Sequence, residues 1–122
     1  LYSVGGMQEQ GGPTTAVAVY DPAANAWSAG PSLLGGPMDG FGSSAQACGD
    51  ALYVTTSTGS IQRLTGEGTA WEFVGQIAQP RFFHRLLPGK PGVLLAVGGA
   101  SEEGHLADIE ELSPKRRPTL EQ

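Results

Sequence analysis

The residues able to bind a transition metal or do redox chemistry are few and lie far apart in the chain. His84, His105 and Cys48 supply all of its imidazole and thiol groups, and no two have the close spacing of a zinc or copper site. We therefore expect both histidines to be ordinary polar residues and no metal to be bound. Cys48 ends an expected strand and is interpreted as a small buried hydrophobe, with a redox-sensing thiol as the alternative.

Glycines after an expected strand raise the question of a phosphate-binding loop. Gly98-Gly99 follows the apolar stretch 93–97, but it leads into Glu102-Glu103, whose carboxylates would repel a phosphate. The chain has no G-x-G-x-x-G at the start of a helix and no G-x-x-x-x-G-K-S/T. It also lacks a G-x-S-x-G nucleophile turn. We expect no cofactor, no catalytic residue and no enzymatic activity.

Carboxylates gather near the end of the chain and could imitate a cation site. They are Glu102, Glu103, Asp108, Glu110 and Glu111. Acidic and apolar residues alternate through 108–112, and this pattern is typical of a strand with one solvated face. The sequence therefore predicts that these carboxylates lie on the solvated face of a strand.

The elements that must position these residues are short strands. Gly (19) and Pro (9) make up 28 of the 122 residues, and only 16% of residues are charged, against about a quarter in a typical soluble domain. A hydrophobic content of 39% is sufficient for a core. Because no periodic stretch continues long without Gly or Pro, the composition predicts an all-β chain with many turns.

Charge and cysteine usage limit the partners and the compartment. The net charge is −5 and no Lys or Arg precedes Arg63, which argues against a nucleic-acid partner. The run Lys115-Arg116-Arg117 is expected in a solvated tail, with a localisation signal or an anionic contact as alternatives. One cysteine favours a reducing, cytoplasmic environment. No apolar stretch approaches 18 residues, so no membrane span is expected.

An internal repeat organises the chain. Tyr20 is followed seven residues later by Trp27, and Leu64 is followed seven residues later by Trp71, so the tryptophans lie 44 residues apart. In each repeat, an apolar strand precedes the strand that carries Tyr20 or Leu64; these apolar strands are expected at 1–4 and 52–54. A third pair of strands of the same kind is expected at 93–97 and 109–112. A further strand at 41–47 precedes the second pair of strands, and its counterpart at 82–87 precedes the third. The small residues of 41–47 fit a crowded position near an axis.

The residues at these turns resemble the kelch repeat. The resemblance rests on Gly5-Gly6, Tyr20-Asp21-Pro22, Asn25 and Trp27, on the second doublet Gly98-Gly99, and on Pro80-Arg81, a pair that commonly opens a kelch unit. It covers nearly the whole chain and implies a kelch-type β-propeller of four-stranded blades. The structural repeat residues are then Gly5, Gly6, Tyr20, Asp21, Trp27, Tyr53, Trp71, Gly98 and Gly99. Tyr and Trp are expected to fill the space between stacked sheets.

Some positions depart from the kelch pattern. Thr55-Thr56 stands where the second unit should have its glycine doublet, Leu64 replaces the usual tyrosine, and Thr119 replaces the third tryptophan. The first unit also lacks its first strand.

We expect a partial propeller over 1–114, with units at about 1–36, 37–78 and 79–114, followed by a basic and polar tail at 115–122. These units make roughly two and two-thirds blades, whereas such propellers close with about four to eight. The remaining blades are therefore expected from the parent chain.

The resemblance also indicates where a partner would dock. Partners of kelch domains commonly bind the face formed by the loops that join the second strand to the third and one blade to the next. The corresponding segments are 7–13, 37–40, 56–59, 79–81 and 101–105, and the candidate residues are Arg81, Gln8, Glu9, Asp39, Ser101, Glu102 and His105. Arg81 is the first candidate because its planar guanidinium can bind a carboxylate bidentately. The alternative is an arginine that bonds its own blade.

The function expected from this resemblance is protein–protein interaction. One form that the resemblance implies is the substrate-recognition part of a BTB-kelch adaptor of a cullin-RING ubiquitin ligase. Two alternatives stay open. A copper enzyme of galactose-oxidase type needs Tyr, Cys and His at one site, but Tyr2, Tyr20 and Tyr53 fall on structural positions. A kelch protein that binds actin or the cytoskeleton is the other.

Overall fold

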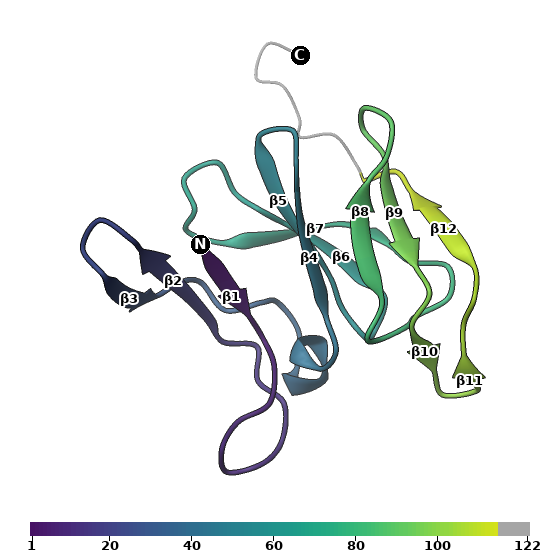
Figure 1. Cartoon of the computed structure of the whole chain (residues 1–122), viewed down its shortest axis with the longest axis horizontal. Coiled ribbons are helices and arrows are strands. Elements are labelled where there is room, and N and C mark those ends of the chain that lie inside the picture. The colour runs from purple at the N-terminus through teal and green to yellow at the C-terminus, as the bar shows by residue number, and fades with distance from the viewer. Residues whose placement is uncertain (115–122) are drawn as a thin grey trace.

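Three antiparallel sheets lie side by side along the chain in the computed structural model, which describes residues 1–114 (Figure 1). The first sheet has the order β1-β2-β3, the middle sheet β4-β5-β6-β7, and the third sheet β12-β9-β8. The strands are β1 (Tyr2–Val4), β2 (Val17–Asp21), β3 (Ala26–Ala29), β4 (Ser44–Cys48), β5 (Ala51–Thr55), β6 (Ser60–Leu64), β7 (Trp71–Gln76), β8 (Arg85–Pro88), β9 (Leu94–Val97) and β12 (Ile109–Leu112). The expected all-β class is confirmed.

Two smaller elements lie in the connections. A short 3-10 helix, η1 (Pro37–Gly40), precedes the middle sheet. A hairpin of two short strands, β10 (Ala100–Ser101) and β11 (Gly104–His105), lies between β9 and β12. Sequence reasoning did not anticipate this hairpin. No helix within residues 1–114 has the length and apolar character needed to cross a lipid bilayer. Lys115, Arg116, Arg117 and Thr119 lie outside the described residues.

The strand register places the sheets in correspondence. Tyr20 pairs with Trp27 across β2 and β3, and Leu64 pairs with Trp71 across β6 and β7. The shared seven-residue spacing therefore correctly predicts that the two tryptophans occupy matching positions in consecutive sheets. Tyr20 also donates its hydroxyl hydrogen to Asn25 Oδ1 at 2.7 Å, which closes the turn between β2 and β3.

The glycine doublets also correspond, but with a shift in the middle sheet. The amide of Gly5 donates to the carbonyl of Ala16, and the amide of Gly98 donates to that of Asp108. In the middle sheet the equivalent hydrogen bond runs from the amide of Thr56 to the carbonyl of Ser60. The doublet position in the middle sheet is therefore Thr56-Ser57, and the alignment with Thr55-Thr56 is wrong by one residue. The φ angles of Gly5 and Gly98 are +66° and +62°. In the shorter β5–β6 loop, Gly59 at +95° makes the reversal instead.

The strands that begin the middle and third sheets are shorter than expected. β4 and β8 start at Ser44 and Arg85, because Gly42 and Phe83 interrupt the extended backbone with φ of +58° and +59°. His84, expected within a strand, therefore lies just before β8, and His105, expected in a loop, lies in β11. A left-handed conformation suits glycine, but it is strained for a bulky residue such as Phe83.

The two tryptophans differ in burial despite their matching positions. Trp71 is 4% exposed and packs with Val17, Leu33 and Val54, whereas Trp27 is 56% exposed. The expectation that Trp27 makes a large buried contact is wrong for this structure. Trp27 packs against the ring of Tyr20, with 5.1 Å between the two ring centroids. Trp71 is covered by the segment that leaves the first sheet.

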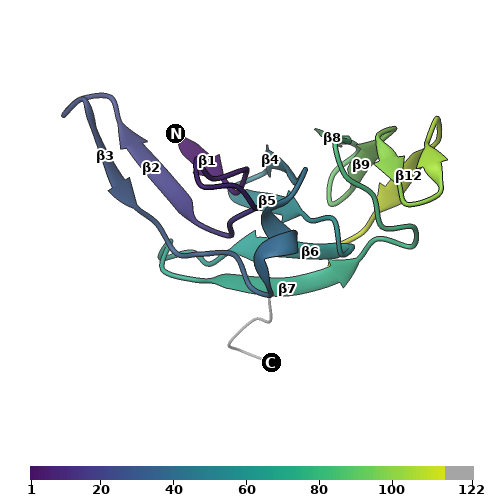
Figure 2. The same cartoon turned by 90° about the horizontal axis from the view of Figure 1, so that it is seen from below.

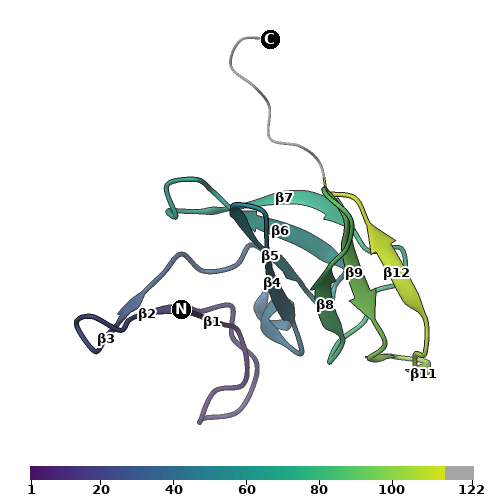
Figure 3. The same cartoon turned by 45° about the horizontal axis from the view of Figure 1, so that its top comes forward.

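Two faces result from the way the sheets fan out. The connections between sheets, the β1–β2 and β5–β6 loops and the β10–β11 hairpin lie together at the lower edge of Figure 1, and we call this the loop face. Figure 2 looks onto it from below. The β4–β5 and β8–β9 turns lie at the upper edge of Figure 1, and the β2–β3 and β6–β7 turns lie to the left, as they also do in Figure 3. We call the side that carries these tight turns the turn face. All five segments expected to form a binding face lie on the loop face.

Candidate functional site

The linker before the middle sheet, residues 30–43, is held to that sheet by contacts that we call the first joint. The side-chain amide of Gln62 accepts from the amide of Leu34 at 2.9 Å and donates to its carbonyl at 3.0 Å. The indole N–H of Trp71 donates to the carbonyl of Pro31 at 2.8 Å. Gln62 and Trp71 thus fix the linker against β6 and β7.

Asp39 completes the first joint from the linker side. Its carboxylate accepts hydrogen bonds from the hydroxyls of Thr56, Thr58 and Ser60, at 2.8, 2.6 and 3.3 Å, and from the backbone N–H of Gly36. Asp39 is buried. The expectation that Asp39 contacts a partner is therefore wrong. Its carboxylate points inward, where it orders the loop face but is not accessible to a partner.

The second joint holds the linker 77–84 to the third sheet. Arg81 is 0% exposed. Its guanidinium forms ion pairs with Asp108 at 3.2 Å and Glu110 at 3.3 Å, and it donates to the carbonyl of Gly98 at 3.2 Å. Glu110 also accepts from the backbone N–H of Ala78 at 2.7 Å.

Arg81 therefore plays a different part from the one first assigned to it. The expectation that Arg81 binds a carboxylate of a partner is wrong for this structure, because its guanidinium is buried and already paired with carboxylates of the third sheet. The alternative considered from the sequence, an arginine that bonds its own unit, describes this geometry. The hydrogen bond from Arg81, with its positive charge, holds the pKa of Asp108 below its usual value.

His84 lies beside the second joint. It is 1% exposed, and its Nε2 lies 2.5 Å from the hydroxyl of Thr55, while its Nδ1 has no hydrogen-bond partner among residues 1–114. Burial, together with the nearby charges of Arg81 and Arg85, lowers the pKa of His84 to about 4. His84 is therefore neutral at pH 7.

The metal ligands of the chain do not come together. Within residues 1–114, no group of three His, Cys, Asp or Glu side chains is placed to hold a metal ion. Cys48 is half-buried and packs against the core between the middle and third sheets. His105 is exposed on β11.

A groove of about 590 Å³ opens on the loop face between the middle and third sheets. One wall is the β10–β11 hairpin with Ser101, Glu102 and Glu103, and the opposite wall carries Ser57 and Thr58 of the β5–β6 loop. The lining residues are Met38, Ser57, Thr58, Gln79, Pro80, Phe82, Ser101, Glu102 and Glu103. Among the sequence candidates, Ser101 and Glu102 line this groove, whereas Gln8, Glu9 and His105 are exposed elsewhere.

Sequence reasoning missed the apolar part of this site. Phe82 and Met38 line the groove, and Phe41, Phe82 and Phe83 form an aromatic cluster with ring centroids 5.2–5.3 Å apart. The side chain of Phe83 is 61% exposed, and its backbone adopts the left-handed conformation described above. The Phe82-Phe83 pair was a visible signal, because two aromatics stand where the preceding unit has Phe41-Gly42.

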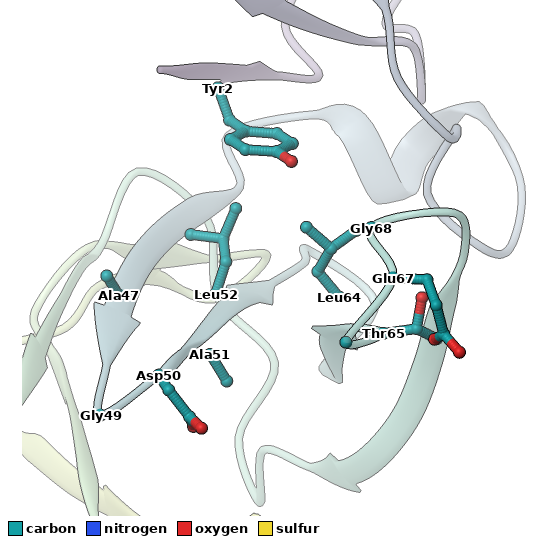
Figure 4. A pocket seen from close by; sticks show the side chains of 11 residues that line it. Tyr2, Ala47, Gly49, Asp50, Ala51, Leu52, Leu64, Thr65, Glu67 and Gly68 are labelled. Atoms are coloured by element: carbon teal, nitrogen blue, oxygen red, sulfur yellow. The ribbon is translucent and has the colours of Figure 1, made fainter.

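A second hollow, of about 690 Å³, lies between the first and middle sheets on the turn face. Figure 4 shows the Tyr2 side chain pointing from β1 toward Leu52 and Leu64, with Asp50 and Glu67 on two different turns at the border. Its two carboxylates, Asp50 and Glu67, come from separate turns, whereas Glu102 and Glu103 of the groove are adjacent on one hairpin. We therefore take the loop-face groove as the candidate site.

Comparison with known proteins supports the fold alone. The chain resembles the solved structure of YjhT, with a TM-score of 0.70 and 20% sequence identity, over 88% of this chain and 38% of that chain. It thus spans less than half the length of YjhT. No known family model matches, and no curated protein matches.

Proposed function

We propose that this chain is part of a kelch-type β-propeller and that its loop face binds a protein partner. The middle sheet has four antiparallel strands in sequential order, as a kelch blade does. The first sheet corresponds to its last three strands and the third sheet to its first three, as the registers of Tyr20-Trp27 and Leu64-Trp71 and of the doublets indicate. The likeness to YjhT supports the fold over 88% of this chain.

The observation that carries the binding role is the groove on the loop face. It is built from three separate segments, namely η1, the β5–β6 loop and the β10–β11 hairpin, together with the second linker. The two joints fix these segments to the sheets through buried polar contacts. A rigid scaffold that brings loops together is a common arrangement for recognition.

The ubiquitin-ligase adaptor is the more specific form of this proposal. It predicts that the protein containing this chain co-precipitates a cullin subunit through a region outside these residues, while the loop face holds the substrate. The enzymatic alternative finds no assembled ligand set in residues 1–114: His84 bonds Thr55, and Tyr20 bonds Asn25.

The test selects peptides from an unbiased displayed library on the full chain and maps bound peptides by hydrogen exchange. We expect protection in 37–40, 56–59, 79–83 and 101–105, which surround the groove. The matched control segments are the turns 22–25, 65–70 and 89–93 on the opposite face. Protection confined to those turns, or failure to select any binder, would contradict the proposed function.

A further inference from the structure

We propose that the loop-face groove binds a peptide segment through an arginine side chain, a proposal that rests on the proposed function and names the chemistry of its partner. Two charged residues line the groove, Glu102 and Glu103, and both carry a negative charge. Both residues are exposed, and neither forms an ion pair within residues 1–114. Their carboxylates are available to a cation.

The cation nearest in sequence to the groove does not neutralise it. Arg81 follows the lining residue Pro80, but its guanidinium is buried and paired with Asp108 and Glu110. The connections of the loop face, residues 5–16, 30–43, 56–59, 77–84 and 98–108, contain five carboxylates and this one arginine. The electrostatic potential of the face therefore favours a basic partner.

Two hydroxyls of the groove also favour a ligand that donates. The hydroxyl hydrogens of Ser57 and Thr58 are directed to the carbonyl of Met38 and the carboxylate of Asp39, at 2.5 and 2.6 Å. These two hydroxyls can offer a ligand only lone pairs. Together with the carboxylates of Glu102 and Glu103, they make a lining rich in acceptors. A guanidinium has five N–H donors and no acceptor.

The apolar lining distinguishes an arginine from a small cation. Phe82 and Met38 lie among the lining residues, and Met38 is exposed. A guanidinium can stack on an aromatic face while its edge binds carboxylates, and the methylene stem of arginine packs on apolar surface. Contacts with Phe41 and Phe83 hold the Phe82 ring in place.

The experiment measures fluorescence anisotropy of a labelled octapeptide, Gly-Ser-Leu-Arg-Arg-Leu-Ser-Gly, with the full chain. Two matched peptides carry citrulline or glutamate in place of both arginines. We expect the arginine peptide to bind at least tenfold more tightly than the citrulline peptide, and the glutamate peptide not to bind. Equal affinity for the arginine and citrulline peptides would overturn the proposal.

Paired variants locate the binding. Glu102→Gln with Glu103→Gln, both on the exposed hairpin, should reduce the affinity for the arginine peptide to that of the citrulline peptide. The control, Asp50→Asn with Glu67→Gln, removes two carboxylates from the turn face and should leave the affinity unchanged. An equal loss in the control pair would show that only the net charge matters and would overturn the proposal.

Failure of this inference can be told apart from failure of the proposed function. If unbiased selection yields loop-face peptides without a cation, and the arginine peptide does not bind, the arginine site is wrong while the loop face remains a binding surface. If no peptide protects the loop face, the proposed function itself is wrong.

Discussion

The first joint and the second joint hold equivalent linkers to equivalent strands, but with opposite placement of charge. In the first, the linker supplies a carboxylate, Asp39, and the sheet supplies hydroxyls and the amide of Gln62. In the second, the linker supplies a guanidinium, Arg81, and the sheet supplies the carboxylates of Asp108 and Glu110.

Gln62 of the first joint and Glu110 of the second joint occupy equivalent positions in the strand register, although their side chains differ in charge. Gln62 and Glu110 follow Ile61 and Ile109, which occupy the same place in the register, and they bond the backbone of Leu34 and Ala78. The repeat therefore constrains where a linker needs a hydrogen-bond partner, and it leaves open which side chain provides one. The two joints should respond differently to substitution, because removing one member of a buried ion pair leaves an uncompensated charge.

The largest effect is expected from Trp71→Ala, which opens the first joint. The variant loses a buried aromatic side chain and leaves the Pro31 carbonyl without its indole donor. We expect the free energy of unfolding, measured by urea denaturation, to fall by about 3–5 kcal/mol.

Trp27→Ala is the matched control at the same register position. Because Trp27 is mostly exposed and contacts chiefly Tyr20, its replacement should cost about 1 kcal/mol. Equal losses in the two variants would show that register position, rather than burial, determines stability.

Arg81→Ala tests the ionic second joint. The substitution leaves Glu110 partly buried without its cation and removes a donor from the Gly98 carbonyl. We expect a loss of about 3 kcal/mol in the free energy of unfolding. Arg85→Ala, which removes an exposed cation four residues away, should change it by less than about 0.5 kcal/mol. A stable Arg81→Ala protein would mean that the second joint is held by its backbone bonds alone.

Exchange of the equivalent side chains sharpens the comparison. Gln62→Glu places a carboxylate against the Leu34 carbonyl and removes the donor that now bonds it, so we expect a loss of about 2 kcal/mol. Glu110→Gln keeps one acceptor oxygen for Ala78 but loses the charge and the second acceptor oxygen beside Arg81. Because Arg81 keeps its ion pair with Asp108, a loss of about 1 kcal/mol is expected. The reverse ranking, measured in the same denaturation series, would refute the assignment of these two roles.

A smaller effect than the loss of Arg81 is a dependence of stability on pH that belongs to the second joint. His84 has a pKa of about 4 in the folded chain, against an ordinary value of 6.5, so the unfolded chain binds its proton first as the pH falls. The stability that neutral His84 provides is present above pH 6.5 and is lost as the pH falls from 6.5 toward 4. We expect a decrease of on the order of 1–2 kcal/mol between pH 7 and pH 5.

The control for this pH effect comes from the first joint, where Ser43 stands at the position of His84. His84→Ser should flatten the change in unfolding free energy between pH 7 and pH 5, whatever its stability at pH 7. An unchanged slope would assign the pH dependence to another group. Asp108 is not that group, because its lowered pKa confines its contribution to more acidic conditions.

The sequence by itself determined the all-β class and the correspondence of the sheets. Strand pairing follows from local signals: the seven-residue spacing from Tyr20 to Trp27 sets the length of a hairpin, and the doublets Gly5-Gly6 and Gly98-Gly99 mark left-handed turns. Where the local signal was absent, the prediction slipped by one residue, since Thr56-Ser57 reaches the same place without glycine.

Only the tertiary structure decided which of these residues are buried and which form the candidate site. Trp27 and Trp71 share a register position, but only Trp71 is covered by a linker from another sheet. Arg81 is buried because Asp108 and Glu110, about thirty residues later in the chain, are brought beside it. The groove likewise joins Met38 to Glu102. Burial and convergence depend on segments distant in sequence, and local spacing carries no information about which of them will pack together.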